Sequence, residues 1–142
     1  MALATSARAQ TATQVIRMEI RPVNQLAVRG TTTFTIPARQ LQAATVVSST
    51  ATYAVTTNEE NRRITVAIDE SLPAGVSLSM RMVAPAGAQA AEDVMLSTVP
   101  QTAVNGISRL NASDLGIAFS LTTGKSAVVP VSITRTVRVT LV

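Results

Sequence analysis

The chain of 142 residues contains no histidine, no cysteine and no tryptophan. These absences remove the side chain that most often transfers protons near neutral pH, the thiol nucleophile, and two common ligands of transition metals. The sequence therefore predicts a protein that is not an enzyme, with no catalytic, cofactor-binding or metal-binding residues and no cofactor. No disulfide can form, but a chain of this length can bury a core without one.

Charged and aromatic residues are also scarce, at 14% and 2% of the chain. The net charge is +4, and the basic residues are scattered, with Arg62-Arg63 as the longest basic run. A nucleic-acid interface usually needs a clustered basic stripe, often with stacking aromatic rings. No apolar run of 18 or more residues occurs either. We therefore expect neither nucleic-acid binding nor a membrane span.

The first ten residues differ in character from the rest of the chain. Ala7-Arg8-Ala9 before Gln10 matches the small-x-small pattern of a signal-peptidase site, without the basic and apolar regions of a complete signal peptide. Residues 1–10 are thus either the remnant of a signal peptide or a flexible tail. The first alternative predicts a secreted, periplasmic or cell-surface protein. Residues 11–142 are expected to form one domain.

Most of this domain shows the two-residue alternation of half-buried β-strands. The alternating or strand-like runs are 15–21, 26–28, 32–36, 48–57, 62–69, 76–83, 94–96, 115–121 and 133–141. Only residues 38–44 have a weakly helical composition, which suggests a loop or one helical turn. Seven to nine short strands separated by turn residues predict an all-β fold, an antiparallel, immunoglobulin-like β-sandwich.

Turn residues suggest how some strands connect. The polar loop Asn58-Glu59-Glu60-Asn61 separates two alternating runs and predicts a β-hairpin. Leu72 to Gly75 and Asn105-Gly106 are also expected to be turns. In the last strand, Arg135 falls on the same face as the apolar residues, which predicts either a position at the rim or a bulge.

The groups that remain for chemistry are carboxylates, Lys125 and Tyr53. The adjacent acid pairs are Glu59-Glu60, Asp69-Glu70 and Glu92-Asp93. A hydrolase would need two such groups on opposite sides of a bond, and a calcium site would need several converging oxygens. The simpler interpretation is solvated loop side chains. We likewise interpret Asn111-Ala112-Ser113 as a polar loop and Gly124-Lys125-Ser126 as a turn.

The terminal strands carry a functional implication. Residues 14–21 and 131–142 both alternate well, and either segment could complete the sheet of a neighbouring molecule by strand addition. The alternative is that each pairs within its own domain.

Parts of the sequence resemble known proteins. The stretches 56–69, 72–78 and 134–141 resemble a group of uncharacterised exported bacterial β-sandwich proteins. The closing strand also resembles the last strand of fimbrial and spore-coat-U-type subunits, which usually carry cysteines that are absent here. The resemblance implies export and surface assembly, and it implies no catalytic residue.

Together these features predict an exported bacterial structural or adhesive surface subunit that associates with itself or with another protein. The alternative is a secreted or periplasmic binding module for a glycan or protein ligand. Scarce aromatic residues count against a glycan, and glycan binding that is lost on substitution of Tyr53 would favour this alternative. A small-molecule ligand is not expected.

Overall fold

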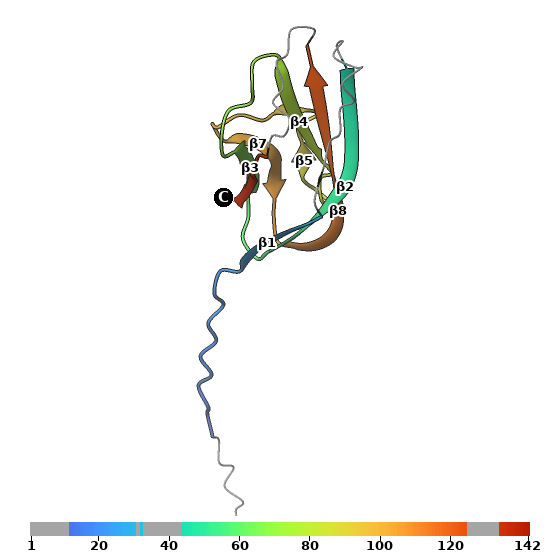
Figure 1. Cartoon of the computed structure of the whole chain (residues 1–142). Coiled ribbons are helices and arrows are strands. Elements are labelled where there is room, and N and C mark those ends of the chain that lie inside the picture. The colour runs from blue at the N-terminus through green and yellow to red at the C-terminus, as the bar shows by residue number, and fades with distance from the viewer. Residues whose placement is uncertain (1–11, 31, 33–43, 125–133) are drawn as a thin grey trace, which may run out of the picture.

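The computed structural model describes residues 12–30, 32, 44–124 and 134–142, which form nine strands and no helix (Figure 1). One sheet has the order β1-β2-β8-β4-β6: Asn24–Arg29, Ala44–Thr57, Leu110–Thr123, Val76–Met82 and Val94–Met95. The other has the order β5-β7-β3-β9: Gln89–Ala90, Gln101–Ile107, Arg62–Ile68 and Val137–Leu141. All pairings are antiparallel, so the predicted antiparallel β-sandwich is confirmed.

The core lies between the two sheets and is built by the alternation seen in the sequence. Successive side chains of a strand point to opposite faces, so every second residue enters the core. The largest fully buried side chains are Tyr53, Ile64, Met80, Ile107, Ile117, Val55, Val66 and Val104. They come from both sheets, and therefore each sheet covers the apolar face of the other.

The pairing of β2 with β8 organises the larger sheet. The two strands remain paired from Ala44 opposite Thr123 to Thr57 opposite Leu110, with two interruptions of the register. At one of them β8 carries an extra residue, and Asp114 there has a φ of 56°. The sequon residues 111–113 lie in this strand, so their interpretation as a loop is wrong.

The predicted hairpin at residues 58–61 is also wrong. The loop does follow β2 and precede β3, but β2 pairs with β1 and β8 whereas β3 pairs with β7 and β9. The chain therefore crosses from one sheet to the other at this loop. Alternation on both sides of a polar loop is compatible with a hairpin in one sheet and with a crossing between two sheets. In both cases each strand buries one of its faces.

Asn105-Gly106 is not a turn but a bulge inside β7. Arg62 pairs with Ile107 and Ile64 with Val104, so β7 has one residue more than β3 between these pairs. Gly106 has a φ of 75°, which suits the bulge because glycine has no Cβ to clash. The chain turns later, at residues 108–109, and again crosses between the sheets.

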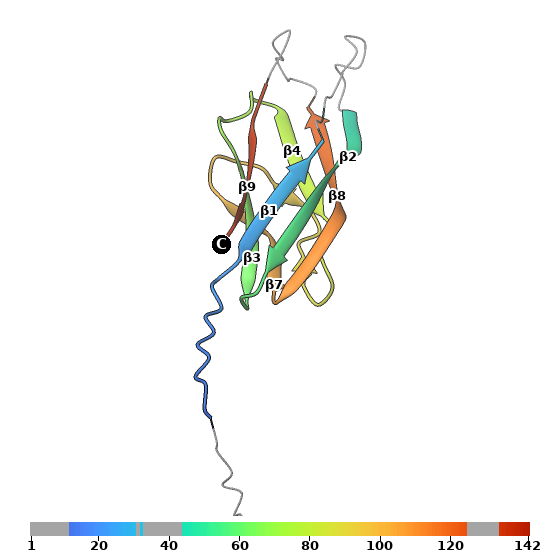
Figure 2. The ribbon, with the colours of Figure 1, turned by 90° about the horizontal axis from the view of Figure 1, so that it is seen from below.

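The structure corrects the N-terminal strand as well. Residues 15–21 are not paired with any described strand and lead away from the sandwich (Figures 1 and 2). Their side chains are exposed. Arg135 precedes β9 and donates hydrogen bonds to the carbonyl oxygen of Ser71, which agrees with the rim position. The expectations for residues 1–10, 33–36, 38–43 and 125–133 lie outside the described residues.

The bulge in β7 predicts that replacing a glycine by alanine destabilises the protein at one strand position and not at another. Gly106→Ala should lower the free energy of unfolding by about 1 kcal/mol, because a Cβ is strained at this positive φ. Gly116→Ala is the control, since its Cβ would lie 3.5 Å from Val83 Cγ2, an ordinary contact. Urea denaturation measures both changes, and an equal loss would contradict the bulge.

Candidate functional site

Two loops that cross between the sheets meet at one end of the sandwich. The backbone N–H of Arg109 donates to the carbonyl oxygen of Glu59 at 2.9 Å, and that of Asn61 donates to Ser108 Oγ at 3.0 Å. An ion pair of 2.9 Å between Arg109 and Glu60 adds to these contacts. The loops 58–61 and 108–109 therefore hold each other in place.

The N-terminal segment leaves the sandwich at this end, where Asn58 binds it. The Asn58 side chain accepts a hydrogen bond from the N–H of Val23 at 2.8 Å and donates one to the carbonyl oxygen of Arg21 at 2.7 Å. The N–H of Asn58 donates to the carbonyl oxygen of Val23 at 3.2 Å. Asn24 is bound in turn by Thr57 and Glu59. These contacts define the point at which residues 12–22 depart.

Beyond this anchor, the segment carries large apolar side chains in solvent. The exposed fractions are 91% for Val15, 73% for Ile16, 86% for Met18 and 89% for Ile20. Arg17, Glu19 and Arg21 occupy the alternate positions, and Glu19 pairs with Arg21 at 3.3 Å. In an extended conformation this segment has one apolar face and one charged face.

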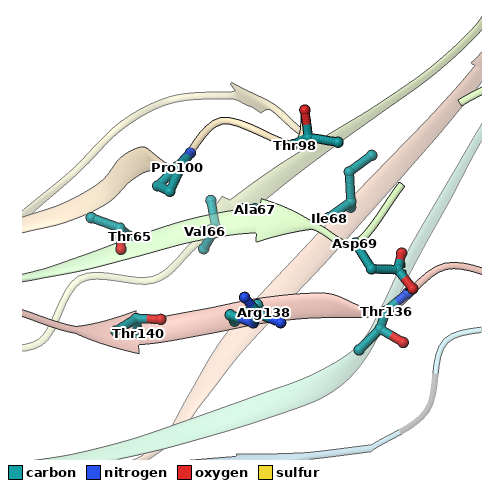
Figure 3. A pocket seen from close by; sticks show the side chains of 10 residues that line it. All are labelled: Thr65, Val66, Ala67, Ile68, Asp69, Thr98, Pro100, Thr136, Arg138 and Thr140. Atoms are coloured by element: carbon teal, nitrogen blue, oxygen red, sulfur yellow. Dashed lines mark hydrogen bonds between the residues drawn. The ribbon is translucent and has the colours of Figure 1, made fainter. Parts of the chain in front are cut away.

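The second feature is a groove of about 450 Å³ on the outer face of the smaller sheet (Figure 3). Its polar and charged lining side chains are Thr65, Asp69, Thr98, Thr136, Arg138 and Thr140. β3 lies between β9 and the segment that carries Thr98 and Pro100. The groove therefore offers hydroxyl groups, one carboxylate and one guanidinium, and no aromatic ring.

Asp69 joins this groove to the start of β9. Its Oδ1 accepts the N–H of Thr136 at 3.0 Å and the N–H of Glu70 at 3.0 Å. Hydrogen bonds to the charged form, first of all from the Thr136 backbone, lower the pKa of Asp69 below its usual value. The carboxylate thus caps the strand and is not a candidate acid near neutral pH.

At least one carboxylate of each acid pair lies beside an arginine, and the arginines differ. Glu59 contacts Arg62, and Glu60 contacts Arg109. Glu70 lies 3.7 Å from Arg135, and Asp93 lies 3.0 Å from Arg81. Within the described residues, no three carboxylates gather closely enough to hold a metal ion.

Tyr53 cannot act as a platform for a glycan. Its side chain is 1% exposed, and its hydroxyl donates to the carbonyl oxygen of Val83. Burial raises the pKa of Tyr53 to about 12. The residue belongs to the core and links β2 to the end of β4.

Sequence reasoning missed Asn58 as an anchor. An asparagine in a polar loop predicts a turn, and its partners at Arg21 and Val23 are 37 and 35 residues away. The apolar face of residues 15–20 is visible in the sequence as alternation, but that pattern predicts a half-buried strand rather than an exposed one.

In the part of the chain that the structure describes, no helix is long and apolar enough to cross a membrane.

Comparison of the chain with protein-family models, curated proteins and solved structures finds no match.

The burial of Tyr53 predicts a specific loss of stability at high pH. Its hydroxyl ionises near pH 10 in the unfolded chain but near 12 in the folded protein, so stability present below pH 10 is lost as the pH rises from 10 to 12. Tyr53 is the only tyrosine, so the absorbance of tyrosinate follows it directly.

We expect a titration midpoint near 12 in the folded protein, and a melting temperature that falls more steeply in this range than that of Tyr53→Phe. A midpoint near 10 without unfolding would contradict the buried position.

Proposed function

We propose that this domain is a non-catalytic, exported bacterial β-sandwich that serves as a structural or adhesive surface subunit and associates with copies of itself by strand addition. The observation that carries the proposal is the apolar face of residues 15–20, which lies in solvent outside the sandwich. Monomeric proteins rarely expose contiguous apolar surface unless it binds something.

Burial of this face would contribute favourable energy to association. Burying one large aliphatic side chain contributes about 1.5–3 kcal/mol, so Ile16, Met18 and Ile20 together offer several kcal/mol. The unpaired backbone of the segment can also form ladder hydrogen bonds with the edge of a sheet. An alternating segment anchored at a defined exit point is therefore well suited to pairing with another molecule.

The electrostatics favour a structural role over catalysis. Four carboxylates are matched to four separate arginines: Glu59, Glu60, Glu70 and Asp93 to Arg62, Arg109, Arg135 and Arg81. Asp69 instead accepts backbone hydrogen bonds and caps β9. Export is supported by Ala7-Arg8-Ala9 before Gln10, which matches the small-x-small pattern of a signal-peptidase site.

The second candidate function is a binding module for a glycan or protein ligand, and the groove beside β9 favours it. Hydroxyl groups with one carboxylate and one guanidinium match the hydrogen-bonding groups of a polar ligand. The lack of an aromatic ring in the lining and the burial of Tyr53 remove the stacking platform that glycan sites commonly use.

Self-association is tested by two glutamine substitutions on opposite faces of the N-terminal segment. Met18→Gln removes an apolar side chain from the face proposed to be buried, and should weaken association about ten-fold. Arg17→Gln is the matched control on the charged face and should change it little. Sedimentation velocity over a range of concentrations measures both, and a protein that stays monomeric throughout would refute the proposal.

Ligand binding in the groove has a separate test. If the groove binds a glycan, a glycan identified in a library screen should raise the melting temperature of the unchanged protein and of the Met18→Gln variant. It should not raise that of the Arg138→Ala variant. Stabilisation that persists in Arg138→Ala would place the ligand elsewhere.

A further inference from the structure

β9 has one edge without a partner among the described residues. The opposite edge pairs with β3, where Arg63 and Val142 exchange hydrogen bonds of 3.0 and 2.8 Å. Because such pairs alternate along an antiparallel ladder, Thr140 and Arg138 also point their backbone groups toward β3. The backbone groups of Val137, Val139 and Leu141 therefore point toward the open edge.

Beside this edge, the inner face of β1 is incompletely covered. Leu26 pairs with Val55 and Val28 with Tyr53, and paired residues share a face of the sheet. Val55 and Tyr53 are buried, yet Val28 is 46% exposed and Leu26 is only half-buried. β1 and β9 lie close to each other but belong to different sheets. A strand added to β9 would extend the smaller sheet toward these two side chains.

The N-terminal segment has the dimensions of such a strand. β9 has five residues, of which Val137, Val139 and Leu141 are half-buried and face the core. Residues 16–20 also number five, and Ile16, Met18 and Ile20 alternate in the same way. Paired with β9, the three apolar side chains would continue its inner face, and the charged ones would lie outward with Arg138.

Charge selects one direction of pairing. If residues 16–20 run antiparallel to β9 with Met18 opposite Val139, Glu19 faces Arg138 directly and Arg17 faces Thr140. In the parallel arrangement with the same central pair, Arg17 faces Arg138 instead. Opposite charges across strands are favourable and like charges unfavourable, so the antiparallel arrangement is preferred.

The antiparallel direction also indicates that residues 16–20 come from a different molecule than the β9 they pair with. β1 and β9 run in opposite directions along the sandwich, and residues 12–23 lead away from it (Figure 2). If the segment folded back beside its own β1 as a hairpin, it would run parallel to β9 and would bring Arg17 against Arg138. It would also have to reverse at residues 21–23, where Asn58 binds the backbone.

We infer that residues 16–20 of one copy add to the open edge of β9 in a second copy, antiparallel and with Glu19 opposite Arg138. This inference rests on the proposed self-association and identifies the edge of β9 as the place where the added strand binds. Each molecule has one donor segment and one acceptor edge, so repeated addition generates head-to-tail chains, unless a ring closes.

The absence of cysteine allows a direct test of the pairing by disulfide formation. Glu19→Cys and Arg138→Cys are made in separate full-length chains and mixed under mild oxidation. In the inferred register the two residues form a non-hydrogen-bonded pair, with Cα atoms about 4.5 Å apart, which lies within the range that a disulfide spans. Mixing Glu19→Cys with Thr140→Cys is the matched control, because these positions would be diagonal and about 7–8 Å apart.

We expect a disulfide-linked dimer in the first mixture and several-fold less in the second. A double variant carrying Glu19→Cys and Arg138→Cys in one chain should give a ladder of linked multimers. Preference for Thr140→Cys, or a disulfide confined to the monomer, would overturn the inference. The inference would also be overturned if no cross-links formed in a protein that sedimentation shows to associate. A protein that never associates would instead contradict the proposed function itself.

Charge reversal provides a second arm that needs no cysteine. Arg138→Glu alone should weaken association about three-fold, and combining it with Glu19→Arg should restore it. Both side chains are exposed, so the fold should tolerate the changes. Equal association in all three proteins would contradict the proposed pair.

Discussion

The long antiparallel pairing of β2 with β8 is the element on which the rest of the structure depends. It joins Ala44–Thr57 to Leu110–Thr123 and places Tyr53, Val55, Ile117 and Phe119 on the same side of the larger sheet. β1 and β4 pair with its two outer edges, and the smaller sheet packs on its apolar face. Because alternate residues enter the core over Ala51–Val55 and Ile117–Phe119, a shift of one residue would expose these side chains.

The same pairing sets the exit of the N-terminal segment. Thr56 and Thr57 lie at the end of β2, opposite Asn111 and Leu110 at the start of β8. Thr56 bonds to Asn111, Thr57 bonds to Asn24, and the next residue, Asn58, holds the backbone of Arg21 and Val23. The crossing loop at residues 58–61 thus also fixes the backbone at the point where the N-terminal segment leaves the sandwich.

The sequence predicted the strands and their buried faces well, but it predicted poorly which strands pair with each other. Alternation identified β3, β4, the 115–121 part of β8 and the apolar face of each, since burial of one face imposes a period of two wherever a strand packs on a core. It could not tell a hairpin from a crossing at residues 58–61, because both geometries bury one face of each strand. Asn105-Gly106 suggested a turn for a similar reason, since a positive φ at glycine serves a bulge as readily as a turn.

By itself, the sequence determined the all-β class, the inward faces of most strands and the shortage of groups for acid–base or metal chemistry. Only the tertiary structure decided which strands pair, that Tyr53 is buried and that residues 15–20 lie outside the sandwich. The physical reason is the range of the interactions. Alternation is a property of neighbouring residues, whereas pairing and burial depend on groups that are distant in the sequence. The anchoring of Val23 and Arg21 by Asn58, for example, joins residues 35 and 37 positions apart.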